Sequence, residues 1–106
     1  MNRGDVCWYT FKMPDKRRPV LILTRDSAIS ALNAVTIAPI TSTIRSIPTE
    51  VVLTEDDGFA HTCALNFDNL QTVPKSNIGA RITRLTSKRM KEVAAAAAFA
   101  LGFDSD

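Results

Sequence analysis

The sequence is poor in the residues that most often carry catalysis and metal binding. Among its 106 residues there is one histidine, His61, and there are two cysteines, Cys7 and Cys63. A single histidine excludes a two-histidine acid–base pair within one subunit, and no nucleophile elbow of a Ser-His-Asp hydrolase accompanies it. The two distant cysteines form neither a CxxC pair nor a disulfide framework. We therefore interpret His61 as a polar residue at the entrance of a strand and both cysteines as buried thiols.

Further signatures are missing, and their absence narrows the class of protein. The chain contains no HExxH motif and no Gly-rich phosphate loop, so we expect neither a metal ion nor a cofactor. Its longest apolar run, residues 93–101, is mostly alanine and far shorter than a membrane span. No signal-peptide pattern precedes the first strand, and unpaired cysteines suit a reducing compartment. We therefore expect a cytoplasmic protein that does not associate with a membrane.

The net charge is small, but the charged residues are unevenly distributed along the chain. The net charge of +2 is too small by itself to indicate nucleic-acid binding. Residues 12–18 nevertheless hold four cations and one acid, Asp15, whereas acids gather at Glu50 and at 55–57. A local basic cluster can hold phosphates while the whole molecule stays nearly neutral. A solvated loop is the commoner explanation of such a charge run, and the sequence leaves both interpretations open.

The length and composition leave room for one domain, residues 1–106, around one hydrophobic core. Short segments rich in β-branched and aromatic residues are predicted as strands. They are residues 5–11, 19–25, 34–41, 49–53, 62–67, 70–74 and 80–85. Pro39 is expected to bend or bulge the third strand. The last strand alternates polar and apolar side chains, as a half-buried edge strand does.

After Thr86 the apolar residues recur at helical spacing. Thr86 or Ser87 is a suitable N-cap, and Gly102 is placed to end the helix in a left-handed conformation. Five consecutive alanines at 94–98 bury little area each, so this helix is expected to lie close against the strands or another chain. Many short strands and one terminal helix predict a mainly β fold, a small antiparallel barrel with a C-terminal α-helix.

The remaining chemistry lies at two strand ends. Arg18 precedes Pro19, which restricts its backbone, and its guanidinium can hold two phosphate oxygens and stabilise charge developing on phosphorus. At the end of the third strand, P-I-T-S-T-x-R at 39–45 supplies hydroxyls that can donate to the same phosphoryl group. RNA carries its own nucleophile, the 2′-hydroxyl, so the protein need not supply one. A turn with capping hydroxyls is the alternative that these residues leave open.

Five segments together resemble the MazF/PemK family of toxin endoribonucleases. They are R-G-D-V-x-W at 3–8, R-R-P-V-L-I-L-T at 17–24, A-P-I-T-S-T-I-R-x-I-P-T-E-V at 38–51, N-F-D-N-L-Q-T-V at 66–73 and I-x-R-L at 82–85. The resemblance covers nearly the whole chain, from Arg3 to Gly102. It implies an SH3-like small antiparallel β-barrel, of the kind found in MazF, CcdB and Kid toxins. It also implies a homodimer that binds RNA in grooves across the dimer interface.

The resemblance implies where the site lies. The family's catalytic arginine falls on Arg18, and its hydroxyl partner falls on Thr41, with Ser42 beside it. In such enzymes the 2′-hydroxyl attacks the adjacent phosphate of single-stranded RNA, without a metal ion. This leaves a 2′,3′-cyclic phosphate and a 5′-hydroxyl at a specific sequence. The residues implied in RNA binding are Lys12, Lys16, Arg17, Thr43, Arg45, Asp68, Asn69 and Gln71.

The family also implies a partner, a MazE-like antitoxin whose acidic C-terminal segment lies over the RNA groove. The basic loop at 12–18 is a suitable docking surface for such a segment. The sequence departs from many family members in one place: their longer first loop has a Gly-rich stretch and an acidic residue. Here that loop is K-M-P-D-K, and Asp15 is its only acid.

Two alternatives share the same fold. One is a CcdB-like toxin that binds gyrase and is not an enzyme, and the other is an RNA-binding barrel without catalysis. Gyrase poisons of this kind end in an aromatic tail, of which Phe103 is the only counterpart after Gly102. The intact R-P-V and P-I-T-S-T-I-R segments favour the nuclease.

Overall fold

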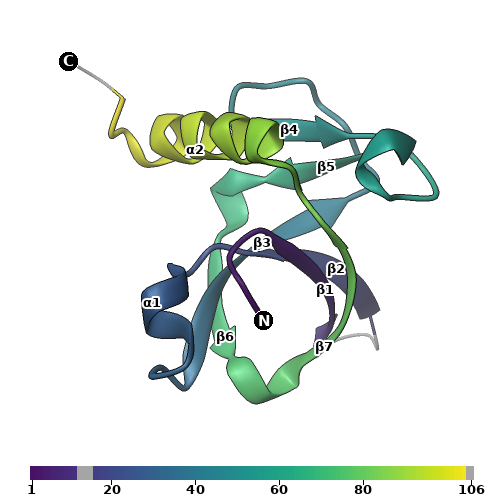
Figure 1. Cartoon of the computed structure of the whole chain (residues 1–106). Helices are drawn as coiled ribbons and strands as arrows, with labels where there is room; N and C mark the ends of the chain where they lie inside the picture. The colour runs from purple at the N-terminus through teal and green to yellow at the C-terminus, as the bar shows by residue number, and fades with distance from the viewer. Residues whose placement is uncertain (12–15, 105–106) are drawn as a thin grey trace.

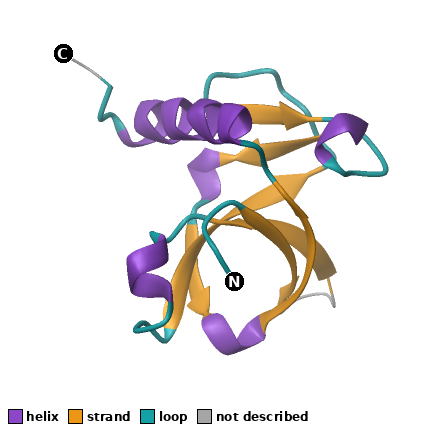
Figure 2. Cartoon of the chain, viewed as in Figure 1, coloured by secondary structure: helices purple, strands orange, loops and turns teal. Residues whose placement is uncertain are grey.

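The computed structural model describes residues 1–11 and 16–104, and within them the chain forms seven strands and two α-helices (Figure 1). Three short 3-10 helices complete the elements (Figure 2). The strands are β1 (Asp5–Phe11), β2 (Lys16–Ile22), β3 (Ala34–Thr41), β4 (Glu50–Leu53), β5 (Cys63–Asn66), β6 (Gln71–Pro74) and β7 (Ile78–Arg84). The helices are α1 (Asp26–Ile29), α2 (Ser87–Leu101), η1 (Glu55–Asp57), η2 (Phe67–Asn69) and η3 (Lys75–Asn77).

The predicted fold class is confirmed: a mainly antiparallel β structure with a C-terminal helix. The strands follow the order β4-β5-β3-β2-β1-β7, and β6 pairs with β3 beside this path. The sheet curls into a barrel-like shape without closing, and α2 lies over β4 and β5 (Figure 1). As predicted, β7 ends the sheet, although it begins at Ile78 rather than at residue 80.

The predicted second strand is wrong at both ends. β2 begins at Lys16 and stops at Ile22, so Arg17 and Arg18 lie on the strand and not in the preceding loop. Cross-strand pairing is the reason, because Arg17 pairs with Thr10 and Arg18 pairs with Tyr9 of β1. The helix α1, which follows β2, was not predicted; at four residues it is too short to show a helical period.

The centre of the fold is β3, whose observed bounds match the prediction. Along one edge β3 pairs first with β6 and then, from Ile40, with β5. Along its other edge the pairing with β2 ends at Pro39, opposite Val20. Of the bend or bulge expected at Pro39, the bulge is not found, since the pairings of β3 have no register shift; the register shifts lie between β1 and β7. Proline donates no ladder hydrogen bond, which fits a strand that changes partners at this point.

The core has two parts. One cluster fills the curl of the sheet around Val20 and Ile37, and the other lies between the sheet and α2 around Leu65 and Phe67. The prediction of buried thiols is confirmed, since Cys7 belongs to the first cluster and Cys63 to the second, and both are free. Burial raises the pKa of both thiols, which keeps them protonated and unreactive at neutral pH.

The boundaries of α2 are also as predicted. Thr86 is the N-cap, and its hydroxyl accepts a hydrogen bond from the Arg89 N–H. Gly102 ends the helix in the left-handed region, at φ 78°. The helix buries Val93 and Ala96 against the sheet and leaves much of its other apolar surface uncovered. In the described part of the chain, no helix has both the length and the apolarity to cross a lipid bilayer.

A half-buried ion pair ties α2 to the turn after β4. The Arg89 guanidinium donates to both carboxylate oxygens of Asp57, at 2.9 and 3.0 Å, and the Thr54 N–H donates to the same carboxylate. Burial alone would raise the pKa of Asp57, but these hydrogen bonds and the positive charge of Arg89 outweigh it and lower the pKa. The turn needs Gly58, which has φ 99°, because a Cβ there would meet Thr83 Oγ1 at 2.5 Å.

We expect Arg89→Ala to lower the free energy of unfolding by about 1–3 kcal/mol at neutral pH, because it leaves the Asp57 carboxylate without its main partner. The folded-state pKa of Asp57 lies below its unfolded value, so its stabilising effect is present above about pH 4 and is lost as the pH falls through the folded pKa. Urea unfolding from pH 7 down to pH 3 measures this. Lys88→Ala, at the exposed neighbouring position, is the control. A parallel pH dependence in wild type and Arg89→Ala would contradict the prediction.

Candidate functional site

A cleft of about 670 Å³ opens where β3 passes from one partner to the next. We call it the Arg18 cleft. It brings together seven of the residues predicted from the sequence, which come from three separate segments of the chain. These are Arg18, Thr41, Thr43, Arg45, Asp68, Asn69 and Gln71. The remaining lining residues are Phe11, Pro39, Ile40, Asn66 and Leu70.

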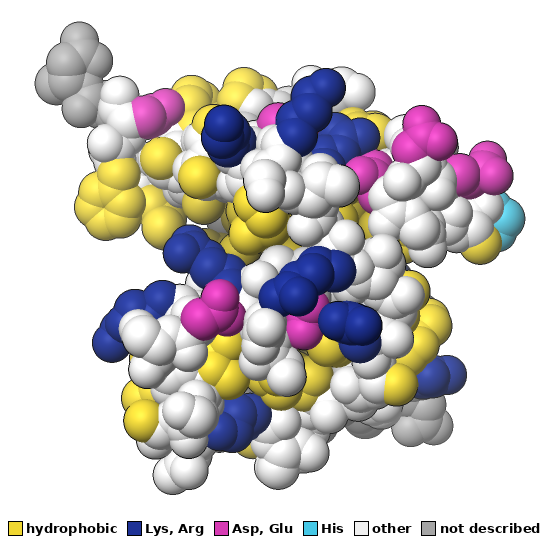
Figure 3. Space-filling model, viewed as in Figure 1, with side chains coloured by type: hydrophobic (Ala, Val, Ile, Leu, Met, Phe, Trp, Pro, Cys, Tyr) yellow, Lys and Arg dark blue, Asp and Glu magenta, His cyan; other side chains and the backbone are white. Residues whose placement is uncertain are grey.

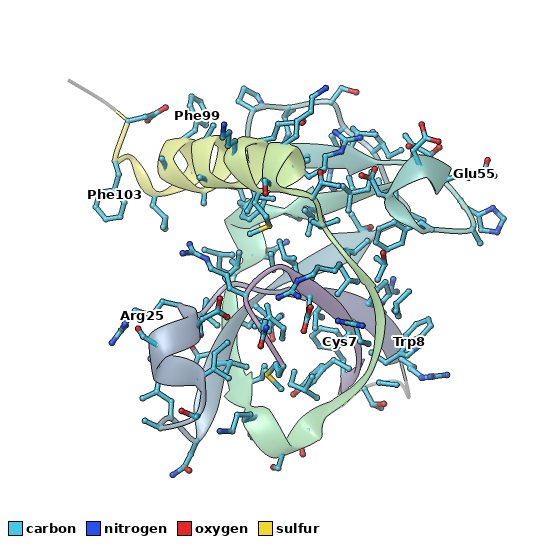
Figure 4. The ribbon with its side chains drawn as sticks, in the orientation of Figure 1. Cys7, Trp8, Arg25, Glu55, Phe99 and Phe103 are labelled. Carbon is cyan, nitrogen blue, oxygen red and sulfur yellow. The ribbon has the colours of Figure 1, made fainter. Side chains whose placement is uncertain are left out.

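Strand alternation directs Arg18 into this cleft and Arg17 away from it. Arg18 lies opposite Tyr9 of β1, and Arg17 lies opposite Thr10, so their side chains leave opposite faces of the sheet. The Arg17 guanidinium carbon sits 4.2 Å from the ring centroid of Trp8, on the outer side of the sheet (Figure 4). Arg17 therefore does not line the Arg18 cleft, although it is the neighbour of Arg18 in sequence.

The same register argument brings Thr41 towards Arg18. Val20 pairs with Pro39, and continuing this antiparallel register by two residues places Arg18 opposite Thr41, on the same face. The Thr41 hydroxyl oxygen accepts the Thr43 N–H at 3.1 Å and keeps its own proton for donation. Ser42 is exposed and is not among the lining residues, so the structure does not bring this predicted catalytic residue into the cleft.

One wall of the cleft is held by Thr49. Its hydroxyl donates to Asp68 Oδ2 at 2.6 Å, and its carbonyl accepts the Phe67 N–H at 2.9 Å. The Asp68 N–H in turn donates to Asn66 Oδ1 at 2.9 Å, which caps η2. These bonds set the position of Asp68 and Asn69 at the rim.

The opposite wall is held by the next residue, Glu50. Glu50 Oε1 accepts the Arg45 N–H at 2.9 Å, in a loop where Ser46 takes a positive φ of 53°. The Glu50 side chain is buried, and its Oε2 has no hydrogen-bond partner among the described residues. The sequence placed Glu50 with the acids of 55–57, and that grouping is wrong, because Glu50 belongs to the interior. Thr49 and Glu50 together connect the two walls.

The cleft is suited to an anion with a flat group attached. It holds two guanidiniums, of Arg18 and Arg45, and one carboxylate, of Asp68, whose Oδ2 already accepts a hydrogen bond from Thr49. Phe11, which packs edge-to-face on Tyr9 with ring centroids 4.8 Å apart, adds an aromatic ring at the end of β1. Such a ring can stack on a nucleic-acid base.

Sequence reasoning missed Phe11 and Asn66 as lining residues. The signal for Phe11 was its place directly before the basic loop, and the signal for Asn66 was its place at the start of the N-F-D-N motif. Two predicted residues are not tested by this geometry. Lys12 lies outside the described residues, as does Asp15, and Lys16 is described only as the first residue of β2, paired with Phe11.

His61 is exposed on the loop before β5 and does not line the Arg18 cleft. Its place just before a strand is the one predicted. Across residues 1–11 and 16–104, no group of three or more histidine, cysteine, aspartate or glutamate side chains is placed to hold a metal ion.

Comparison with known proteins identifies the family to which the chain belongs. The family of PemK-like, MazF-like toxins of type II toxin–antitoxin systems matches residues 2–101. The chain belongs to this family. Among curated MazF relatives, endoribonuclease MazF3 of Mycobacterium tuberculosis is 41% identical over 92 residues, which cover 87% of each chain. Probable endoribonuclease MazF2 of the same species is 38% identical over 93 residues, which cover 87% of this chain and 89% of the relative.

Solved structures of the MazF family have the same fold. Toxin MazF-mt6 of Mycobacterium tuberculosis has a TM-score of 0.85 at 35% identity, over 92% of this chain and 96% of its own. An endoribonuclease in complex with its cognate antitoxin, from a mycobacterial species, has a TM-score of 0.87 at 26% identity, over 100% of this chain and 99% of its own. The chain is thus a member of a family of toxin endoribonucleases.

Proposed function

We propose that this protein is the toxin of a type II toxin–antitoxin system and cuts single-stranded RNA in the Arg18 cleft without a metal ion. The observation that carries the proposal is the shared cleft of Arg18 and Thr41, the two positions on which the family's catalytic arginine and hydroxyl fall. Endoribonuclease relatives at 38–41% identity support the reaction class.

In the proposed reaction the 2′-hydroxyl of the substrate attacks the adjacent phosphorus atom. The new bond forms from the 2′-oxygen, which gives up its proton to solvent, and the bond to the 5′-oxygen breaks as that oxygen takes up a proton from solvent. The step therefore consumes no water and no net proton. The products are a 2′,3′-cyclic phosphate and a 5′-hydroxyl. Arg18 binds two nonbridging oxygens and stabilises their growing charge in the phosphorane, and the Thr41 hydroxyl donates to one of them.

The other lining residues position the RNA. Arg45 holds a flanking phosphate, the aromatic ring of Phe11 stacks on a base, and the amides of Asn69 and Gln71 bind base edges. These edges are free only in an unpaired strand, which favours single-stranded RNA. A volume of about 670 Å³ suits a small ligand such as one or two nucleotides rather than a duplex.

The direct test is incubation of the purified protein with a defined single-stranded RNA in EDTA. The proposal predicts fragments with 2′,3′-cyclic phosphate and 5′-hydroxyl ends, at one recurring sequence. Arg18→Ala purified in parallel controls for a contaminating ribonuclease. A plain RNA-binding barrel or a gyrase-binding toxin predicts intact RNA.

Thr49 is expected to act as a positioning residue for Asp68. Thr49→Val keeps the shape of the side chain but removes its hydroxyl, and with it the 2.6 Å hydrogen bond. One lost hydrogen bond, about 0.5–1.5 kcal/mol, corresponds to a roughly 2–10-fold fall in kcat/KM. Thr49→Ser, which keeps the hydroxyl, should restore most of the activity. Equal losses in both variants would show that packing, and not this hydrogen bond, is responsible.

We also propose that the protein is a homodimer that pairs through α2 and the surface beside β4. Phe99, Leu101 and Phe103 are 49%, 54% and 81% exposed, and both phenylalanines project from the end of α2 into open space (Figure 4). A groove of about 500 Å³ next to them is lined by six apolar residues of α2, β4 and the preceding loop, including Pro48 and Val52, and by the charged residues Glu50, Arg89, Glu92 and Asp104. An apolar surface of this kind is characteristic of a protein–protein contact.

Light scattering at micromolar concentration should therefore give twice the mass of one chain. Phe99→Glu places a charge in the expected interface and should shift the mass towards the monomer. Lys91→Glu, a charge reversal on another part of α2, is the control and should remain dimeric. A wild-type monomer at these concentrations would contradict the dimer.

The proposed partner is an antitoxin whose acidic, disordered C-terminal segment lies over the Arg18 cleft and blocks it. The two guanidiniums of the cleft support this, because they attract carboxylates as well as phosphates. The solved complex of a mycobacterial relative with its cognate antitoxin supports the existence of such a partner. In the CcdB-like alternative the aromatic residues at the end of the chain would bind gyrase. The curated relatives of this chain are endoribonucleases, which favours the nuclease over that alternative.

A further inference from the structure

A second cleft, of about 460 Å³, lies between the first half of α2 and the turn before β1. We call it the Arg84 cleft. Its rim carries the cations Arg3, Arg84 and Lys91, and its floor includes Leu85 and Val93. It shares no lining residue with the Arg18 cleft. Figure 3 shows lysine and arginine side chains gathered over the middle of this face, around the hollow between α2 and the strands below it.

Positive charge exceeds negative charge around this cleft. Arg81 and Arg84 of β7 both lie against Asp5, at 3.7 and 3.4 Å, and their side chains remain 58% and 48% exposed. Asp5 is buried, so one hidden carboxylate stands against two guanidiniums that reach solvent. Asp26, which lines the cleft, already accepts the Arg3 N–H at 2.7 Å.

The helix extends the basic surface. Lys88 is exposed one turn before Lys91, and residues three apart lie side by side on a helix. We define the β7–α2 basic patch as Arg3, Arg81, Arg84, Lys88 and Lys91. Its five cations against two carboxylates leave an excess of three positive charges, in a chain whose whole net charge is only +2. The net charge of the remaining residues is therefore slightly negative, and the patch is a second basic surface, apart from the Arg18 cleft, that attracts a polyanion.

We propose that the β7–α2 basic patch binds the phosphate backbone of an RNA stem next to the single-stranded segment that enters the Arg18 cleft. The inference rests on the proposed function in that both sites act on one RNA. It defines the substrate class more closely, as an RNA with a hairpin beside the cleavage site.

Three features favour a nucleic-acid backbone over an acidic protein. Three of the five cations are arginines, whose planar guanidinium matches two phosphate oxygens. The cations come from the N-terminal turn, β7 and α2, and Arg81 and Lys88 lie outside the lining of the Arg84 cleft, so the positive surface is wider than a pocket for a short peptide. The longest dimension of the chain is 36 Å, so a short RNA stem is long enough to reach from one cleft to the other.

The test compares two RNAs that contain the same cleavage sequence, one a linear single strand and the other with an adjoining hairpin stem. A 2′-deoxy group at the cleavage position prevents cutting, so binding is measured by itself. The variant is the triple Arg3→Gln/Lys88→Gln/Lys91→Gln, whose three side chains make no hydrogen bond or ion pair to a described residue. Arg81 and Arg84 are left in place because they hold Asp5.

We expect the triple variant to bind the hairpin RNA roughly tenfold more weakly near 0.1 M salt, with a salt slope lower by up to about three, since each phosphate contact contributes about one. Binding and cleavage of the linear RNA should not change. Arg45→Gln, in the Arg18 cleft, is the contrasting variant and should weaken binding of both RNAs alike.

Three results would overturn the inference: unchanged hairpin binding, equal weakening for both RNAs, or loss of antitoxin binding with hairpin binding intact. The last would assign the patch to a protein partner. A failure of the proposed function is separate from these, because wild-type protein would then leave the unmodified forms of both RNAs uncut, while the binding comparison on the 2′-deoxy RNAs still reports on the patch.

Discussion

Arg18→Ala is expected to lower turnover on single-stranded RNA by about 100-fold or more, with the fold intact. The size of the effect follows from the loss of a preorganised donor to a charge that grows in the transition state, which typically costs 100- to 1,000-fold. Single-turnover cleavage of a defined RNA measures the loss, and thermal unfolding checks the fold. Arg18 is only half-buried at the cleft, so its removal should disturb packing little.

Arg18→Lys separates charge from geometry, because lysine keeps the positive charge but cannot hold two oxygens at once. It should recover only part of the lost activity. Arg17→Ala is the matched control, since Arg17 stacks on Trp8 on the other face of β2 and should keep activity within a few-fold. Near-normal turnover of Arg18→Ala would remove Arg18 from the mechanism.

A single 2′-deoxy substitution at the cleavage position is expected to abolish cutting of an otherwise unchanged RNA. The nucleophile of the proposed reaction belongs to the substrate, and the cleft supplies donors rather than an attacking group. Gel analysis of end-labelled RNA, with the enzyme in excess over many turnover times, gives the readout.

The same RNA with the 2′-deoxy group moved two nucleotides away is the control, and it should be cut at the normal rate. Binding of the two RNAs should be alike, so that a difference in cleavage reports the missing nucleophile. DNA cut as readily as RNA would exclude attack by the 2′-hydroxyl and would require a nucleophile from the protein or from water.

Much of the fold was predictable because its signals are local. The bounds of β3 and the caps of α2 follow from β-branched runs, hydroxyl N-caps and a terminal glycine, each of which acts within a few residues. The start of β2 was not predictable, because Lys16 and Arg17 have no local reason to be extended. They are extended because they pair with Phe11 and Thr10 of β1.

The functional site, like the fold, was predictable only in part. The motifs around Arg18, Thr41 and Asp68 were recognisable from residue type and order, and the structure places these three in one cleft. Ser42 and Arg17 have the same chemistry as their neighbours and could not be told apart from them by sequence. A one-residue step along a strand reverses the face on which a side chain lies, and the face depends on register with another strand.

The sequence by itself determined the fold class, the family and most of the polar residues that line the Arg18 cleft, because these depend on local propensity and on motifs in order along the chain. Only the tertiary structure decided that Arg17 stacks on Trp8 and that Glu50 is buried beneath the Arg45 loop. It alone also gathered cations from the N-terminal turn, β7 and α2 on one face. Those outcomes depend on contacts between segments far apart in the chain, and no local pattern of residues encodes such contacts.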